Sequence, residues 1–368
     1  MGSAEEHGAS IQLLRLFKAP RVAHANFIII TISAKADGYR GKKFFAELSF
    51  QKARTMKNKL ISVAGPTASG KSDLALFLAE RFSGEIISFD SMQIYRGMDI
   101  GTAKPTKEEL ARVRHHMIDV ADPTENFSVA DFAAKAKEII ADVQARSKTP
   151  ILCGGTGLYL DSLLFCTEFG ELEANEAYRK ELADFAAKNG NAALHDILAE
   201  KDPEAAEKIH MNNVKRVIRA LEIIRSSGMT KTEWDKKARA NASAIPCTMI
   251  ALNYRDREKL YARIDLRVDI MMQSGLFEEV SSLYESGKLI KGTTAYDAIG
   301  YKEMIYCVRG EDTRESAAEK IKLATHHYAK RQLTWFLRNK EINWLYPDDY
   351  GSKEELYAAA EKTVLENR

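Results

Sequence analysis

The hydrophobic residues of this chain follow two alternating patterns. Short, mainly apolar runs of strand length occur at residues 60–64 (LISVA), 85–90 (EIISFD) and 150–157 (PILCGGTG). Between them, apolar residues recur every three or four positions, as in residues 73–82 (DLALFLAERF) and 132–146 (FAAKAKEIIADVQAR). The runs are typical of buried strands, and the spacing is typical of helices that cover them. This alternation predicts a parallel sheet with crossover helices.

Local signals refine these elements. Gly84 is expected to stop the first helix, and Ser128 with Asp131 predicts a capping box at the start of the second. Residues 115–120 (HHMIDV) and 245–253 (IPCTMIALN) predict two further strands. We therefore expect an α/β fold whose ligands bind beyond the carboxyl ends of the strands.

From about residue 168 the pattern becomes helical. Four consecutive segments have helical spacing, at residues 175–190, 191–202, 203–210 and 212–228. Because a strand follows, they predict an all-helical insertion in the α/β unit. The expected organisation is an N-terminal extension outside the core (1–55), the first part of the core (56–167), the insertion (168–243), a return to the core with basic C-terminal helices (244–350) and a C-terminal helix (351–368).

Charge separates the first 55 residues from the rest. They hold nine Lys and Arg against four Asp and Glu, a net charge of +5, whereas the whole chain carries +2, which leaves −3 for the remainder. We interpret them as an appendage that the activity does not need, because the sequence restarts at Met56 like a natural protein start. An organelle transit peptide, which would also be basic, is the alternative, and Glu5 and Glu6 weigh against it. If the remainder binds nucleic acid, its basic residues must be gathered locally.

The composition also bounds the cellular setting. The sequence has no stretch of eighteen or more apolar residues, so it predicts no membrane span. The four cysteines are far apart and form no C-x-x-C pair, which argues against a disulfide framework and against a zinc site. A reducing cytosol is the expected location.

A phosphate-binding loop follows the first predicted strand. Residues 65–72 read GPTASGKS and match the pattern G-x-x-x-x-G-K-[ST] at every fixed position. The backbone N–H groups, the helix N-terminus and Lys71 would hold a di- or triphosphate, and Ser72 would place its hydroxyl on a magnesium ion. The motif leaves the reaction open. A kinase of a small metabolite, in which the loop holds ATP and Asp90 serves as a magnesium ligand or base, is one alternative.

Six motifs carry a resemblance to a known family. In chain order they are GPTASGKS (65–72), DSMQIYRGMDIGTAKP (90–105), GGTGLYLDSLL (154–164), KRVIRALE (215–222), AIGYKEM (298–304) and AKRQLTWF (329–336). Together they resemble the tRNA dimethylallyltransferases, also called tRNA isopentenyltransferases, over residues 59–346. The chain looks like the bacterial members, and a P-loop-type sheet is what the resemblance implies.

The resemblance also implies an activity. Enzymes of this family transfer a dimethylallyl group from its diphosphate to the exocyclic N6 amine of the adenosine 3′ of the anticodon, position 37 of tRNA. It implies Mg²⁺ as cofactor, dimethylallyl diphosphate and the tRNA anticodon stem-loop as partners, and a cytoplasmic monomer that binds no membrane. Asp90 matches the family's catalytic aspartate. A base is useful there because the lone pair of the amine is delocalised into the purine.

Site residues are carried over by the same resemblance. The residues assigned to catalysis are Asp90, Lys71, Thr156 and Arg267, with Arg263 as the competing choice for the last. The residues expected to bind the diphosphate are Gly65, Pro66, Thr67, Ala68, Ser69, Gly70, Lys71 and Ser72. The residues expected to bind tRNA are Asp90, Ser91, Met92, Gln93, Lys215, Arg216, Arg219, Tyr296, Gly300, Tyr301, Lys330 and Arg331.

Gln93, Thr156 and Trp335 carry specific expectations. The amide of Gln93 can present a donor and an acceptor to an adenine edge. Thr156 is also expected to cap the helix that follows it. Trp335, on an apolar stripe of its helix, is interpreted as a core residue and not as a base-stacking platform.

Two further alternatives remain open at this point. A relative that prenylates free adenine nucleotides would share the chemistry, and a non-catalytic RNA-binding protein would keep the loop as a relic. The helical region after residue 168 and the basic motifs favour tRNA, because contact with a phosphate backbone needs clustered Lys and Arg. The sequence departs from the family pattern at residues 209–213, which read IHMNN in place of a segment close to IHPND. Asn213 is expected to cap the helix there.

Overall fold

The structure is a computed structural model that describes residues 60–165, 175–240 and 245–367. The N-terminal extension expected at residues 1–55 lies outside the described residues. None of the described helices is long and apolar enough to cross a membrane.

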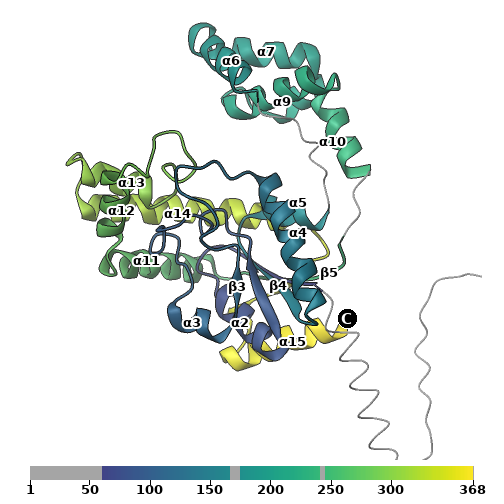
Figure 1. The fold of residues 1–368 in the computed structure, drawn as a ribbon, viewed down its shortest axis with the longest axis vertical. Helices are drawn as coiled ribbons and strands as arrows, with labels where there is room; N and C mark the ends of the chain where they lie inside the picture. The colour runs from purple at the N-terminus through teal and green to yellow at the C-terminus, as the bar shows by residue number, and fades with distance from the viewer. Residues whose placement is uncertain (1–59, 166–174, 241–244, 368) are drawn as a thin grey trace, which may run out of the picture. The chain divides into compact units, whose positions relative to one another are not determined.

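A six-stranded parallel sheet forms the centre of the core (Figure 1). The strands lie in the order β3-β2-β4-β1-β5-β6, and every neighbouring pair is parallel. Their bounds are β1 (Leu60–Ala64), β2 (Gly84–Ser88), β3 (His115–His116), β4 (Thr149–Gly154), β5 (Cys247–Leu252) and β6 (Asn343–Leu345). The predicted α/β fold with a parallel sheet is confirmed.

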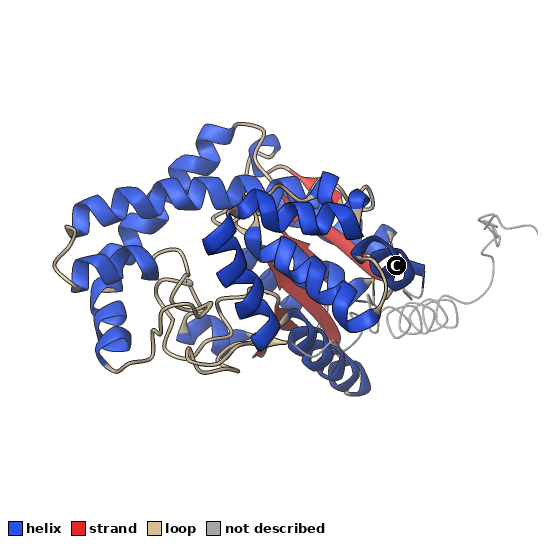
Figure 2. Cartoon of the chain, turned by 90° about the horizontal axis from the view of Figure 1, so that it is seen from above, coloured by secondary structure: helices blue, strands red, loops and turns tan. Residues whose placement is uncertain are grey.

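Helices cover both faces of this sheet (Figure 2). The helices outside the insertion are α2 (Lys71–Arg81), α3 (Lys107–Arg112), α4 (Val129–Ala145), α5 (Gly157–Leu164), α11 (Arg257–Gln273), α12 (Leu276–Glu285), α13 (Tyr301–Val308), α14 (Arg314–Phe336) and α15 (Lys353–Glu366), with a 3-10 turn at Pro347–Asp349. Alternate side chains of β1 pack on opposite faces of the sheet. Leu60 and Ala64 pack with α4, α5 and α14, whereas Ile61 and Val63 pack with α2 and α15.

Two local predictions about strand and helix ends are wrong. The third predicted strand, at 115–120, is only the two-residue β3, because Met117 and Asp119 have φ angles of 63° and 57°, which no strand accommodates. Helix α2 ends at Arg81, and Ser83, with φ of 50°, makes the turn that Gly84 was expected to make. Gly84 instead begins β2, where a Cβ would lie 2.7 Å from the carbonyl oxygen of Thr149.

Two other local predictions hold, and a third does not. The capping box at the start of α4 is confirmed, because Ser128 accepts the Asp131 N–H and the Asp131 carboxylate accepts the Ser128 N–H at 2.8 Å. The strand predicted at 245–253 is β5. Asn213 occupies the N-cap position of α9, but its side chain makes no capping hydrogen bond, so the prediction that it caps this helix is wrong.

Five helices between α5 and β5 form a group of their own. They are α6 (Glu176–Asn189), α7 (Asn191–Lys201), α8 (Pro203–Lys208), α9 (Val214–Ser227) and α10 (Lys231–Ala240), and they include the four helical segments predicted for this region. Figure 1 shows α6, α7, α9 and α10 beside one another. Leu194, Leu198, Val217 and Leu221 are buried in one cluster, so α6 to α9 share a small hydrophobic core.

A further cluster fixes the segment that follows β2. Ile94, Tyr95 and Met98 are buried against residues of α11 to α14, among them Leu276 and Met304. The polypeptide around Asp90 is therefore held from the C-terminal half of the chain.

Candidate active site

A cavity of about 490 Å³ lies beyond the carboxyl ends of β1, β2 and β4. Parallel strands end on one edge of a sheet, so the loops that follow them meet there. The predicted site residues that line the cavity are Thr67, Lys71, Ser72, Asp90, Ser91, Met92, Gln93, Lys215, Arg267, Gly300 and Arg331. The structure thus brings half of the assigned residues to one cavity, with members from the diphosphate, catalytic and tRNA sets.

A second cavity, of about 240 Å³, lies against the phosphate loop and α11. Its lining includes the loop residues 68–73 together with Arg263, Leu266 and Ile270. Lys71, Ser72 and Arg267 line both cavities. These three residues mark the boundary between the two spaces.

The phosphate loop has the backbone shape expected of an anion cradle. Gly70 has φ of 92°, the left-handed conformation that glycine adopts without strain, and it forms the N-cap of α2. Lys71, the first residue of α2, donates from Nζ to the Pro66 carbonyl oxygen at 3.2 Å. Burial lowers the pKa of Lys71. A diphosphate would replace that carbonyl as the partner of the ammonium group.

The two candidate arginines make different contacts. The Nη1 of Arg267 lies 3.5 Å from the Thr67 hydroxyl, and burial lowers the pKa of this arginine while the Asp90 charge raises it. The Nε of Arg263 donates to the Ala68 carbonyl oxygen at 2.8 Å. Arg267 faces both cavities and Arg263 only the smaller one. The geometry therefore favours Arg267, which lies between the loop and Asp90.

Asp90 follows β2 and faces the larger cavity. Its Oδ1 accepts the Met92 N–H at 2.9 Å, and its own N–H donates to the Ser88 hydroxyl at 3.3 Å. Within the parts of the chain that the structure describes, no donor bonds to Oδ2. One carboxylate oxygen thus holds the local turn, and the other is available to accept a proton.

Thr156 stabilises the residue next to Asp90. Its Oγ1 accepts the Ser91 N–H at 3.1 Å and donates to the Ser91 hydroxyl at 3.3 Å. Thr156 is the N-cap residue of α5, as predicted, but its side chain makes no capping hydrogen bond, because these contacts engage it. The loops after β2 and β4 are joined at this point.

Gln332 is a site residue that the sequence analysis missed. Its Oε1 accepts the Thr67 N–H at 2.9 Å, and its Nε2 donates to the Gly155 carbonyl oxygen at 3.0 Å. A Cβ on Gly155 would lie 2.1 Å from that nitrogen. The available signal was its spacing from the buried residues Ala329 and Phe336, which places an amide on the inner face of α14.

Two residues expected to contact tRNA have other partners. Tyr301 is fully buried, and its hydroxyl donates to Glu279 at 2.6 Å, so the prediction that it contacts RNA is wrong. The Gln93 amide accepts the Ser88 hydroxyl at 2.8 Å and donates to the carbonyls of Thr102 and Ala103. Gln93 also lines the larger cavity, so its contact with an adenine edge stays a prediction.

The remaining RNA candidates differ in their exposure. Lys215 and Arg216 on α9 and Lys330 and Arg331 on α14 are exposed. Arg219 forms an ion pair with the buried Glu222, which gives it a structural role within the helical group. Tyr296 is half-buried against the cluster formed by α11 to α14.

Trp335 packs in the core. Its Nε1 donates to Asp161 at 2.7 Å, and its ring lies where a Cβ on Gly157 would approach within 2.2 Å. The interpretation of Trp335 as a core residue is confirmed.

Comparisons with known proteins agree with this geometry. The model of the family described as IPP transferase matches residues 93–340. A protein named tRNA dimethylallyltransferase from Thermoanaerobacter sp. (strain X514) is 46% identical over 303 residues, which cover 82% of this chain and 96% of that protein. A protein of the same name from Halalkalibacterium halodurans is 47% identical over 289 residues, which cover 78% and 91% of the two chains.

Solved structures give the same result. The tRNA isopentenylpyrophosphate transferase of Bacillus halodurans is 42% identical, with a TM-score of 0.62 over 84% of this chain and 98% of that one. A eukaryotic dimethylallyltransferase acting on tRNA is 28% identical, with a TM-score of 0.69 over 84% of this chain and 80% of that one. With the family's motifs gathered around one cavity and relatives matched over nearly their full length, the chain belongs to the IPP transferase family.

Proposed function

We propose that this chain transfers a dimethylallyl group from dimethylallyl diphosphate to the exocyclic N6 amine of the adenosine 3′ of the anticodon in tRNA. One observation carries the proposal: Lys71 and Ser72 of the phosphate loop line the same cavity as Arg267 and Asp90. A diphosphate on the loop would thus face a carboxylate across a space that admits an allyl group and a base.

In the proposed reaction, the N6–carbon bond forms as the bond between the allylic carbon and the diphosphate oxygen breaks. The proton of the amine passes to the free Oδ2 of Asp90, and diphosphate leaves with the bonding electron pair. Lys71 and Arg267 stabilise the negative charge that develops on the leaving group. Their partial burial strengthens this effect, because the same charges are screened less away from water.

Magnesium belongs to the same proposal. Ser72, the exposed hydroxyl beside Lys71, is the residue that would hold the ion, with diphosphate oxygens and water as further ligands, since Mg²⁺ prefers oxygen ligands and keeps several waters. Bound there, the ion would neutralise charge on the leaving group. Within the described residues, no group of three or more His, Cys, Asp and Glu side chains is placed to hold a metal ion.

The acceptor must reach Asp90 from a folded RNA. A base stacked in an anticodon loop has to swing out to expose its amine to the allylic carbon. Ser91 and Met92 line the cavity beside Asp90, and the exposed Lys330 and Arg331 offer charge to the phosphate backbone. We also propose, from the family resemblance, that the chain is a monomer and acts in the cytoplasm.

The test is a transfer assay with mass spectrometry. The chain is incubated with Mg²⁺, dimethylallyl diphosphate and one of three acceptors: unmodified tRNA, the same tRNA with guanosine at the target position, or AMP, ADP and ATP. We expect one dimethylallyl group on the unmodified tRNA alone. Prenylation of the free nucleotides would favour the nucleotide prenyltransferase alternative, and phosphate transfer from ATP to a metabolite would favour the kinase.

A further inference from the structure

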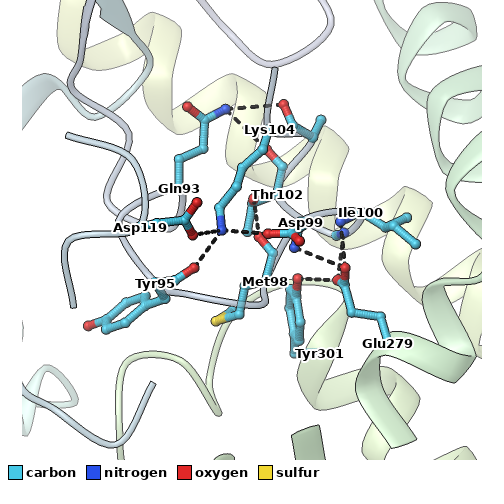
Figure 3. A network of polar contacts seen from close by, with 12 residues as sticks. Gln93, Tyr95, Met98, Asp99, Ile100, Thr102, Lys104, Asp119, Glu279 and Tyr301 are labelled. Carbon is cyan, nitrogen blue, oxygen red and sulfur yellow. Dashed lines mark hydrogen bonds and ion pairs between the residues drawn. The ribbon is translucent and has the colours of Figure 1, made fainter. Parts of the chain in front are cut away.

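The carboxylate of Glu279, on α12, holds the segment that follows Asp90 (Figure 3). Its Oε2 accepts the N–H groups of Asp99 at 2.9 Å and Ile100 at 2.7 Å, and its Oε1 accepts the Gly101 N–H at 3.1 Å. The Tyr301 hydroxyl completes the set at 2.6 Å. Four donors converge on one charged group, and hydrogen bonds to a charged acceptor are the stronger kind.

The approach of Tyr301 to this segment is very close. A Cβ on Gly101 would lie 2.5 Å from the Tyr301 ring, so no larger residue fits between them. Burial and the Glu279 charge raise the pKa of Tyr301, which keeps its hydroxyl protonated and able to donate. We call the pair Glu279 and Tyr301 the clasp.

The backbone from Gly101 to Ala103 connects the clasp to a series of hydrogen bonds that leads to Asp90. The carbonyls of Thr102 and Ala103 accept from the Gln93 Nε2 at 3.3 and 3.2 Å, and the Gln93 Oε1 accepts from the Ser88 hydroxyl at 2.8 Å. The Ser88 oxygen in turn accepts the Asp90 N–H at 3.3 Å. Gly101, Thr102 and Ala103 also line the cavity, so the clasp holds both a wall of the site and the backbone of the proposed base.

Lys104 closes this segment on itself. Its ammonium group donates to the Tyr95 carbonyl oxygen at 2.7 Å and forms ion pairs with Asp99 at 2.6 Å and Asp119 at 2.5 Å. Its side chain is only 6% exposed. Figure 3 shows these contacts beside those of Gln93 and Glu279. The segment is thus fixed internally, and the clasp adds a polar attachment to α12 and α13 beside the hydrophobic contacts of Ile94, Tyr95 and Met98.

We infer that Glu279 is a positioning residue for the prenyl transfer. Assisted by Tyr301, it fixes residues 99–103 and, through Gln93 and Ser88, sets the place of the Asp90 carboxylate relative to the acceptor amine. This role rests on the proposed function. It concerns the acceptor and not the donor, because neither clasp residue touches Lys71 or Arg267.

The variant Glu279→Gln keeps the shape of the side chain but removes the charge and half of its acceptor capacity. We expect kcat to fall on the order of 10- to 100-fold, since small displacements of a catalytic group cost about that much. The KM for dimethylallyl diphosphate should stay within about twofold of wild type, because the change does not touch the residues proposed to bind this donor. In hydrogen exchange, the amides of residues 99–101 should lose protection.

Two comparisons separate positioning from general damage. Glu278→Gln changes the neighbouring glutamate of α12, which pairs with Arg314 at the surface, and should match wild type in kcat and exchange. Gln93→Ala interrupts the same series of hydrogen bonds. If the clasp acts through Gln93, the double variant with Glu279→Gln should lose no more activity than the poorer single variant.

Tyr301→Phe removes a single hydroxyl and decides the outcome if Glu279→Gln does not fold. A kcat loss of about threefold or more at an unchanged melting temperature supports the inference. A kcat equal to wild type in the folded variants, or multiplicative losses in the double variant, overturns it. If the wild-type chain transfers no prenyl group to any acceptor, the proposed function has failed. The exchange comparison at residues 99–101 then still shows whether the clasp holds its segment.

Discussion

Gln332 provides the sharpest test of how the phosphate loop is held. Its amide joins the Thr67 N–H to the Gly155 carbonyl, and the side chain is only 5% exposed. Gln332→Leu has a similar size but no polar atoms, so both backbone groups lose their partner at once.

The expected cost follows from those two bonds. Leaving a buried donor or acceptor without a partner costs about 1–3 kcal/mol, so two groups together predict about 2–6 kcal/mol. Thr67 is half-buried and can turn toward water, which favours the lower part of that range, about 2–4 kcal/mol. At about 2 °C per kcal/mol for a large domain, the melting temperature should fall by about 4–8 °C.

The same change should weaken donor binding. Thr67 faces Arg267, so a displaced loop should raise the KM for dimethylallyl diphosphate, by about tenfold if one charge-assisted contact is lost. Thermal unfolding and initial-rate kinetics measure the two effects. Thr334→Ala, an exposed residue of the same helix whose hydroxyl bonds to the Lys330 carbonyl, is the matched control and should match wild type in both measurements. If Gln332→Leu had the wild-type melting temperature and KM, the bridge would not hold the loop.

Four further predictions test other parts of the molecule. Asp90→Asn should lower kcat by about 10²-fold or more and leave tRNA binding in filter assays unchanged, whereas an active variant would exclude Asp90 as the base. Lys71→Ala should raise the KM for dimethylallyl diphosphate, and unchanged kinetics would mean that the loop does not hold the donor. Hydrogen bonds from Arg146 lower the pKa of Glu85 to about 2, so its stabilisation is complete above about pH 4.5 and is lost as the pH falls toward 2. The melting temperature of Glu85→Gln should therefore fall less steeply over that range, and parallel curves would contradict this. Lys330→Ala should weaken tRNA binding and reduce the slope of log K against log salt by about one, and an unchanged slope would place Lys330 away from the RNA.

The parts of the fold that were predictable are those that local pattern determines. The run at 60–64 is buried on both faces of the sheet, so its apolar character alone identified β1 to the residue. Gly70 is required by the backbone shape of the phosphate loop and Lys71 by the charge of its ligand, and the motif shows both directly. By contrast, β6 is a three-residue edge strand that forms only because β5 is beside it, and nothing in its own sequence indicates it.

A site residue was predictable where it directly follows a strand that ends at the cavity. Asp90 and Thr156 follow β2 and β4, and topology alone brings them together. Gln332 and Glu279 lie on helices far along the chain. Helical spacing predicts which face of a helix a polar residue occupies, but it does not predict what that residue contacts. Tyr301 was assigned to the wrong surface for the same reason, because a tyrosine beside a glycine turn is equally compatible with a buried hydroxyl and with an exposed ring.

The close fit of α14 against the loop after β4 has a consequence for the order in which the protein becomes active. Gly155 and Gly157 leave room that Gln332 and Trp335 fill, so the two halves of this contact are made about 175 residues apart in the chain. A ribosome that has completed residue 300 has already released the phosphate loop and Asp90 but has not yet made the helix that braces them. The donor site is therefore completed only near the end of synthesis, and a truncated chain that ends before α14 would carry the reacting groups without the support that aligns them.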